Sequence, residues 1–230
     1  MSKEKFSFYK EHPKTCNPDD FWGQVKRTVN GEPVAQDQID MIVEAVVKSL
    51  ELNEDDTLLD LCCGNGALST LLFKHCKGGL GVDFSEHLIS IANRYFSNPP
   101  DQMYHLQDVI EFCEDPIMPC NFSKMVCYGS FPFIEQERAE AMLCLLNSKF
   151  PNIERVFIGN CPDKSLLEKF YGDRKLTPDN ESDPDTAIGI WRTQEEFISL
   201  AKHCGWKATI HIMPEQYYAA HYRYDVILTK

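Results

Sequence analysis

The hydrophobic positions of the chain form short apolar runs that alternate with segments of helical period. Over residues 36–52, isoleucine, valine and leucine recur three or four positions apart, which predicts a helix with one buried face. The same reading predicts helices over 67–75, 85–96, 110–114 and 135–150, and strands over 57–61, 79–84, 103–109, 124–128 and 155–161. Strands that alternate with helices indicate an α/β fold, with a mostly parallel sheet covered by helices on both faces.

The end of the chain departs from this alternation. Thr193 to Glu196 form a capping box, which predicts a helix that begins there and ends before Gly205. Two strand-like runs follow, over 207–213 and 222–229, and the connection between them is too short for a helical crossover. We therefore expect these two strands to pair antiparallel and to complete a seven-stranded sheet.

Two segments lie outside this pattern. Residues 173–185 are polar and acidic without a period, and we expect a surface loop there, either a passive connector or a lid. Residues 1–35 are expected to form a cover segment without strands, which leaves 36–230 as a single domain. The cover carries aromatic side chains, which form either a mobile lid or ordinary packing, and prolines that prevent one long helix: Phe6, Phe8, Tyr9, Phe21 and Trp22, with Pro13, Pro18 and Pro33.

Composition and charge restrict the classes of function. The 230 residues, of which 43% are hydrophobic and 11% aromatic, are typical of one folded domain. With 23 basic and 35 acidic residues the net charge is −12, which disfavours nucleic acid and anionic membranes as partners. The N-terminus has no signal-peptide run and no stretch has the length of a membrane span, so we expect a cytoplasmic monomer or homodimer.

The ten cysteines are expected to be reduced thiols of the core. Cys127, Cys144 and Cys161 lie in apolar runs, where a thiol packs as a small hydrophobic group. The short Cys-x-x-Cys and His-x-x-x-His spacings of metal sites do not occur in the sequence. No metal site is therefore predicted.

Candidate ligand-binding residues lie where three of the predicted strands end. The first strand runs into Asp60-Leu61-Cys62-Cys63-Gly64-Asn65-Gly66, a glycine turn that lets a ligand approach backbone N–H groups. Asp83 ends the second strand, where a carboxylate can accept hydrogen bonds from both hydroxyls of a ribose, and Asp108 ends the third. Open α/β sheets bind ligands at the carboxyl ends of their strands, so these positions predict a nucleotide-type site.

With these motifs, the chain from residue 36 onward resembles the class I S-adenosylmethionine-dependent methyltransferases, which have a Rossmann-like fold. The segment 60–66 resembles the first motif of that family, Asp-x-Gly-x-Gly-x-Gly, with Cys62 in place of the first glycine. Three further segments resemble its ribose-binding, adenine-binding and methionine-end regions, in the order 81–85, 107–109 and 125–133. The resemblance implies S-adenosyl-L-methionine as the cofactor and S-adenosyl-L-homocysteine as the product.

The resemblance also implies roles for single residues. Asp83 would bind the ribose hydroxyls and Asp108 the adenine amino group. Tyr128 would lie near the sulfonium unless it is a buried strand residue with a satisfied hydroxyl. Asp60 would order the glycine loop or a water at the cofactor amine, and Phe84 would stack beside the adenine unless it is a core residue. The full implied set is Asp60, Cys62, Gly64, Gly66, Asp83, Phe84, Asp108, Val109 and Tyr128.

The methyl acceptor is harder to derive from the sequence. A sulfonium methyl group is already activated, so transfer needs alignment and, for some acceptors, removal of a proton, but no metal. The candidate bases are Tyr128, His221 and Tyr9. Lys26 and Arg27 are cations in an acidic protein, and either can pair with the methionine carboxylate, Arg27 being the preferred one.

The expected function is methyl transfer to a small-molecule acceptor. After the fourth strand, Tyr128-Gly129-Ser130-Phe131 replaces the Asn/Asp-Pro-Pro-aromatic segment with which related enzymes methylate amino groups of bases or glutamine. One alternative is a non-catalytic S-adenosylmethionine-binding sensor or partner subunit. A nicotinamide-dependent oxidoreductase is a weaker alternative, because Ser69 stands where Gly-x-Gly-x-x-Gly needs its third glycine. An arsenic-methylating thiol enzyme is a narrower one, and it requires thiols at the methyl end.

Overall fold

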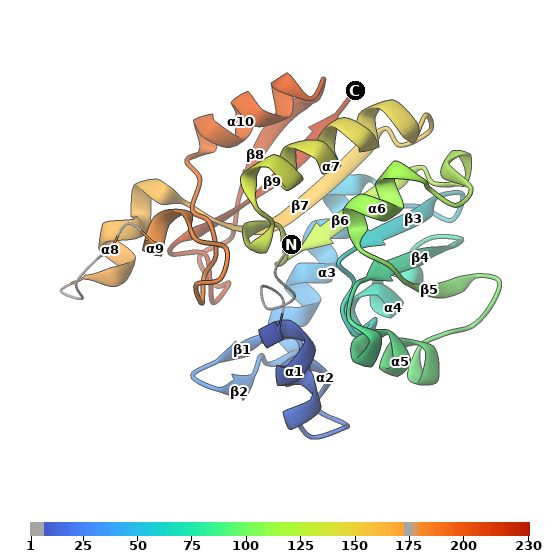
Figure 1. Cartoon of the computed structure of the whole chain (residues 1–230), viewed down its shortest axis with the longest axis horizontal. Helices are drawn as coiled ribbons and strands as arrows, with labels where there is room; N and C mark the ends of the chain where they lie inside the picture. The colour runs from blue at the N-terminus through green and yellow to red at the C-terminus, as the bar shows by residue number, and fades with distance from the viewer. Residues whose placement is uncertain (1–6, 173–176, 178) are drawn as a thin grey trace.

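A seven-stranded sheet forms the centre of the protein in the computed structural model, which describes residues 7–172, 177 and 179–230 (Figure 1). The strand order is β5-β4-β3-β6-β7-β9-β8. The strands are β3 Thr57–Leu61, β4 Gly78–Asp83, β5 Gln102–Leu106, β6 Lys124–Tyr128, β7 Arg155–Pro162, β8 Lys207–Ile212 and β9 Arg223–Thr229. The first five are parallel and β9 pairs antiparallel with both β7 and β8, so the predicted fold class is confirmed.

Helices cover both faces of this sheet, and each face has its own buried cluster. One face carries α3 Gln36–Leu50, α4 Ala67–Phe73 and α5 Glu86–Tyr95. The other face carries α6 Val109–Glu114, α7 Gln136–Lys149 and α10 Gln194–His203. Short 3₁₀ helices, Pro119–Asn121 and Phe131–Phe133, flank β6. The strand order turns back at β3, which lies between β4 and β6, and a crevice for a ligand is expected at the carboxyl ends of those strands.

The starts of two helices are set by side chains next to them in the chain. Ser85 caps α5 by accepting a hydrogen bond from the Leu88 N–H. At α10, Thr193 accepts from the Glu196 N–H and the Glu196 side chain accepts from the Thr193 N–H, which is the predicted capping box. Gly205 follows this helix with a positive φ of 83°, as expected for a residue just past a helix end.

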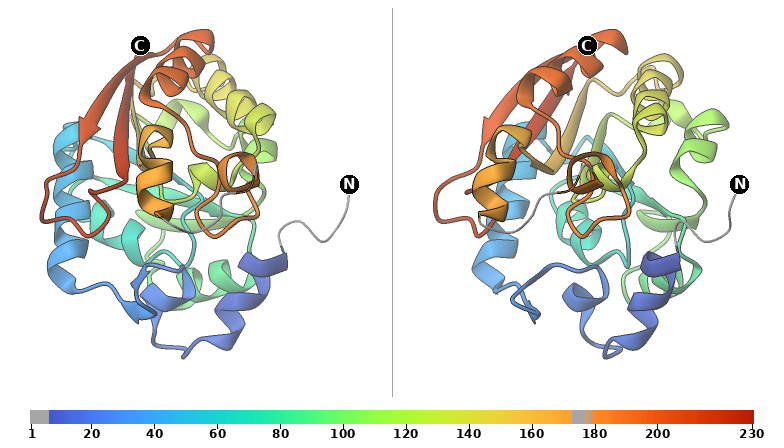
Figure 2. Two further views of the ribbon diagram at one scale, coloured as in Figure 1. Left: turned by 90° about the vertical axis from the view of Figure 1, so that its left-hand side faces the viewer. Right: turned by 60° about the vertical axis from the view of Figure 1, so that its left-hand side comes forward.

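The N-terminal segment packs against the carboxyl end of the sheet, at the end of the molecule away from α10 and the C-terminus (Figure 2). It contains α1 Ser7–Thr15, α2 Phe21–Gln24 and a hairpin of β1 Thr28–Val29 and β2 Glu32–Pro33. The expectation of a cover without strands was therefore wrong. Asn30 and Gly31 both have positive φ, which suits a two-residue hairpin turn, but strands of two residues are too short to produce a period in the sequence.

The connection between β7 and α10 is more structured than its sequence indicated. It contains a 3₁₀ turn Lys164–Leu166, α8 Leu167–Tyr171 and α9 Asp179–Ser182. The last of these falls within the segment 173–185, for which a loop was expected, while 173–176 and 178 lie outside the described residues. Across the described part of the chain, no helix is both long and apolar enough to cross a membrane.

Candidate functional site

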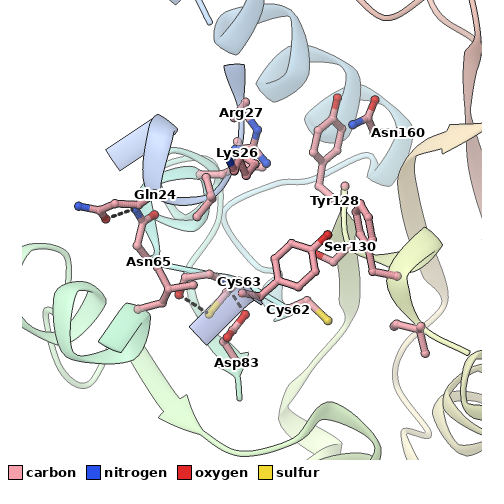
Figure 3. A pocket seen from close by; sticks show the side chains of 18 of the residues that line it. Gln24, Lys26, Arg27, Cys62, Cys63, Asn65, Asp83, Tyr128, Ser130 and Asn160 are labelled. Atoms are coloured by element: carbon pink, nitrogen blue, oxygen red, sulfur yellow. Dashed lines mark hydrogen bonds between the residues drawn. The ribbon is translucent and has the colours of Figure 1, made fainter. Parts of the chain in front are cut away.

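A cavity of about 910 Å³ lies at the carboxyl ends of the central strands, beneath the N-terminal segment (Figure 3). Most of the predicted site residues line it: Tyr9, Arg27, Asp60, Cys62, Gly64, Asp83, Phe84, Asp108, Val109 and Tyr128. Gly66 and His221 are not among the lining residues. The structure therefore gathers at one place residues that the sequence spreads over more than a hundred positions.

The two predicted glycines are required for packing as well as for the turn. Gly64 has a φ of 59°, and a Cβ at this position would lie 2.9 Å from the Val25 side chain of the N-terminal segment. Gly66 has a φ of 79°, and a Cβ there would lie 2.7 Å from the ring of Tyr104. Gly66 is thus the N-cap of α4, and its lack of a side chain leaves space for Tyr104. It is not one of the residues that line the cavity.

Asp83 fixes the glycine loop while lining the cavity. One carboxylate oxygen accepts a hydrogen bond of 3.0 Å from the Gly64 N–H, and the other accepts one of 2.9 Å from the Ser85 N–H. The residue is 5% exposed, and burial raises the pKa of its carboxyl to about 6. Because a carboxylate has about four lone-pair positions, Asp83 can still accept hydrogen bonds from hydroxyl groups of a ligand.

Asp60 connects β3 to α4. Its carboxylate accepts a hydrogen bond of 2.6 Å from the hydroxyl of Ser69. Burial raises the pKa of Asp60 to about 7, while the positive charge of Arg27 acts in the opposite direction. Ser69 is the residue that stands in place of the third glycine of the nicotinamide motif, and here its hydroxyl has a defined structural partner.

Asn65 attaches the N-terminal segment to the glycine loop. Its side-chain amide donates hydrogen bonds of 2.7 Å to the Phe21 carbonyl and 2.8 Å to the Gln24 side chain. The Gln24 amide in turn donates to the carbonyls of Asn17 and Pro18. Neither Asn65 nor Gln24 was predicted as a site residue, because nothing within either local segment indicates that the other would be its partner. The two line one wall of the cavity in Figure 3.

Comparison with known proteins agrees with this architecture. No family model matches the chain. Over 75 residues it is 32% identical to an uncharacterized methyltransferase of Schizosaccharomyces pombe, a stretch that spans 33% of this chain and only 27% of that protein.

Solved structures are similar over 85% or more of the chain. Magnesium protoporphyrin IX methyltransferase from Synechocystis, with bound S-adenosylmethionine, has a TM-score of 0.63 at 14% identity. The similarity covers 100% of this chain and 99% of that one. A DhpI complex has a TM-score of 0.65 at 14% identity, with 100% of both chains covered. An S-adenosylmethionine-dependent methyltransferase from Clostridium acetobutylicum has a TM-score of 0.61 at 17% identity, over 85% of this chain and 92% of that one.

The fold is that of the class I S-adenosylmethionine-dependent methyltransferases. In this fold, Asp108 lies two residues after β5, directly before α6, so the expectation that it ends the strand was wrong. Its carboxylate caps α6 by accepting from the Ile110 N–H at 2.9 Å and also accepts hydrogen bonds of 2.6 and 2.7 Å from Arg138. Arg138 lines the cavity and was not predicted, since it comes from α7, 30 residues further along the chain.

The other walls of the cavity include Phe84 and Arg27. The Lys10 ammonium lies 5.4 Å from the centre of the Phe84 ring, so this ring faces α1. The Arg27 guanidinium lies 5.2 Å from the centre of the Tyr128 ring and 5.4 Å from that of Trp22. Arg27 of the cover therefore lies next to the end of β6, on the same side as Tyr128 (Figure 3).

The three candidate bases have different positions in the fold. The hydroxyl of Tyr128 lies 2.7 Å from the hydroxyl of Tyr217, and burial raises its pKa well above the ordinary range. Burial and the nearby Asp185 also raise the pKa of Tyr9. His221 lies outside the cavity, where its exposed ring packs 4.7 Å from Tyr222. Neither Tyr9 nor Tyr128 is thus predisposed to accept a proton, and His221 does not line the cavity.

Two further residues of the cavity, Asn160 and Arg223, were not predicted from the sequence. They come from β7 and β9, the strands at which the sheet changes to antiparallel pairing. The part of the chain that the structure describes contains no group of three or more His, Cys, Asp or Glu side chains placed to hold a metal ion.

Proposed function

We propose that the chain transfers a methyl group from S-adenosylmethionine to a small-molecule acceptor. The observation that carries this proposal is the buried carboxylate of Asp83, which lines the cavity and holds the Gly64 N–H at the point where the strand order turns back. A carboxylate in this position matches the two adjacent hydroxyls of a ribose. The methyltransferase fold and the similar structures with bound S-adenosylmethionine support the same ligand.

The remaining lining residues suit the other parts of the cofactor. Phe84, Asp108 and Val109 would surround the adenine, with Asp108 already oriented by Arg138. Arg27 would pair with the methionine carboxylate, and the aromatic face of Tyr128 would lie near the sulfonium. A cavity of about 910 Å³ is at the upper end of the range for ligand sites, and it has room for an acceptor beside the cofactor.

The proposed catalysis depends on alignment. S-adenosylmethionine, when bound, supplies a methyl group on a positively charged sulfur. Tyr9 and Tyr128 are held in their protonated forms, so these residues would orient the acceptor and exclude water, and neither would act as a strong base. We further propose that residues 1–35 act as a cover, which limits the acceptor to molecules small enough to enclose. The net charge of −12 supports a small molecule over nucleic acid.

Titration calorimetry with S-adenosylmethionine, S-adenosylhomocysteine and a nicotinamide dinucleotide tests the proposal. Micromolar binding of the first two and none of the third is expected. Binding of the dinucleotide alone would overturn it. Incubation with methyl-labelled cofactor and a pool of small metabolites then separates an enzyme from a sensor, because a sensor would bind the cofactor without labelling any product.

A further inference from the structure

Arg223 is a buried cation at the wall of the cavity. It begins β9, is 8% exposed and lines the cavity. Its Nη1 donates a hydrogen bond to the Asn160 carbonyl, and its guanidinium lies 4.8 Å from the centre of the Tyr222 ring, but its Nε is buried without a partner. Within residues 7–172, 177 and 179–230, no carboxylate lies within ion-pair distance of it. Burial of a charge is costly unless it is paired, so this arrangement favours an anionic ligand.

A second buried arginine shows the contrast. Arg192 is 6% exposed, and its Nε and Nη2 both donate to the Gln136 side-chain oxygen, at 3.1 and 2.9 Å. Arg192 does not line the cavity. The unsatisfied Nε is therefore specific to the arginine that faces the site.

Asn160 presents a second unsatisfied group beside Arg223. It lies at an irregularity in β7 and has a φ of 67°. Its backbone N–H donates a hydrogen bond of 2.8 Å to the carboxylate of Asp225. Its side-chain amide forms no hydrogen bond with any described residue, and the amide oxygen is fully buried. Because this amide lines the cavity, it is available to a hydroxyl or amine of a ligand.

These two residues belong to the end of the cavity away from the expected ribose site. In Figure 3, Asn160 lies next to Tyr128, and Asp83 lies at the opposite side of the view. Arg223 lowers and Asp185 raises the pKa of Tyr9, so both charges act on the hydroxyl end of that residue.

The other cations of the cavity have different surroundings. Arg138 is paired with Asp108, the Lys26 ammonium lies over the ring of Phe8, and Arg27 lies next to Tyr128 and is proposed for the methionine carboxylate. We therefore propose that the methyl acceptor carries a carboxylate or phosphate group that binds Arg223, and a hydroxyl or amine that binds the Asn160 side chain. This inference rests on the proposed methyltransferase function.

The test uses the full chain and three variants, Arg223→Gln, Arg223→Lys and Arg192→Gln. The protein is incubated with methyl-labelled S-adenosylmethionine and small metabolites separated by anion-exchange chromatography. Wild-type protein is expected to label only acceptors in the fractions retained by the anion exchanger. Pretreatment of those fractions with phosphatase removes the labelled product for a phosphate acceptor and leaves it for a carboxylate acceptor.

With the acceptor so identified, Arg223→Gln is expected to raise its KM by at least about tenfold, with S-adenosylmethionine affinity within about twofold of wild type. Arg223→Lys keeps the charge and is expected to recover part of the loss, while Arg192→Gln has the wild-type KM. The inference is overturned if the labelled acceptor is neutral or cationic, if Arg223→Gln has the wild-type KM, or if that variant loses cofactor affinity as much as turnover. If Arg223→Gln does not fold, Arg223→Lys takes its place. A KM above that of wild type for an anionic acceptor then supports the inference, and a wild-type KM contradicts it. Absence of cofactor binding by the wild-type protein would instead reject the methyltransferase function itself.

Discussion

The side-chain amide of Asn65 donates a hydrogen bond of 2.8 Å to the side-chain oxygen of Gln24, 41 positions earlier in the chain. Asn65 is 1% exposed and Gln24 is 2% exposed, so no solvent competes for this bond. The bond joins the glycine loop, which is expected to receive the cofactor, to the segment that covers it. We therefore expect the cover to contribute to the order of the loop as well as to enclosure.

Replacement of Asn65 by Ala tests this connection. The change leaves the buried Gln24 oxygen without a donor, which should lower the free energy of unfolding by about 1–3 kcal/mol. Cofactor affinity should fall too, because the loop loses its attachment. Urea denaturation and calorimetry measure the two effects, and Asn121→Ala, at an exposed asparagine, is the matched control. Equal stability of the Asn65 variant and the control would show that the bond has no energetic role.

Asp83 is expected to contribute to ligand affinity and to loop structure at once. Asp83→Ala should weaken S-adenosylmethionine binding by roughly 1.5–3 kcal/mol, the range for hydrogen bonds to a charged group. Because the carboxylate also accepts from Gly64 and Ser85, the Ala variant should lose stability, whereas Asp83→Asn keeps one acceptor and should lose less. Calorimetry and thermal denaturation of both variants separate these effects. Unchanged affinity in both would place the ribose elsewhere.

The affinity for the cofactor should depend on pH through the same residue. The pKa of Asp83 in the free protein is about 6, and hydroxyl groups donate more strongly to the ionised carboxylate. Binding therefore favours the ionised form, and affinity should rise as the pH passes through about 6 and level off above about 7. Calorimetry from about pH 5 to about pH 8 measures this. Asp83→Asn should lack most of the rise, and a flat wild-type profile would contradict the assignment.

Ionisation of the buried Asp60 should lower the free energy of unfolding as the pH increases. Its folded pKa of about 7 lies above the ordinary value of 3.8, so the unfolded chain releases this proton first. The contribution of Asp60 to the free energy of unfolding is thus largest below about pH 4 and declines until about pH 7, by an amount on the order of 4 kcal/mol. Asp60→Asn cannot ionise and keeps an acceptor for Ser69. Denaturation of both proteins at acid and neutral pH should show the variant gaining relative stability as the pH rises, and a constant difference would contradict this.

The start of the chain is expected to act on turnover more than on cofactor affinity. Phe8 and Tyr9 of α1 line the cavity, and the ring of Tyr9 lies 5.2 Å from that of Phe133 in the loop after β6. Removal of residues 1–15 deletes these contacts but keeps the hydrogen bonds that the Gln24 amide donates to the carbonyls of Asn17 and Pro18. The truncated protein should bind S-adenosylmethionine and transfer methyl slowly.

Arg27→Ala is the complementary change for the cover. It should weaken cofactor binding directly, because Arg27 is proposed for the methionine carboxylate. Calorimetry and a single-turnover assay distinguish the two variants. A full transfer rate in the truncated protein would mean that the aromatic residues of α1 serve only for packing.

The fold class and most of the elements follow from local patterns in the sequence. The apolar periods predict the helices and strands of the domain, and the caps at Ser85 and Thr193 depend on residues within one helical turn. The glycine turn and Asp83 were found for the same reason: a strand end, its turn and the following helix start form a local pattern. Such signals can be read without knowledge of the fold, because the groups that interact are neighbours in the chain.

The pairing of residues far apart in the chain depends on the tertiary structure. The sequence makes Tyr128 a candidate base, but its hydroxyl lies 2.7 Å from that of Tyr217, 89 positions away. His221 turned out to lie outside the cavity, and Gly66 to pack against Tyr104. Arg223 and Asn160 come together through the antiparallel register of β9 on β7, which no short segment encodes. The physical reason is the same in each case: a side chain's partner across the sheet depends on strand order and register, and both arise only when the whole core packs.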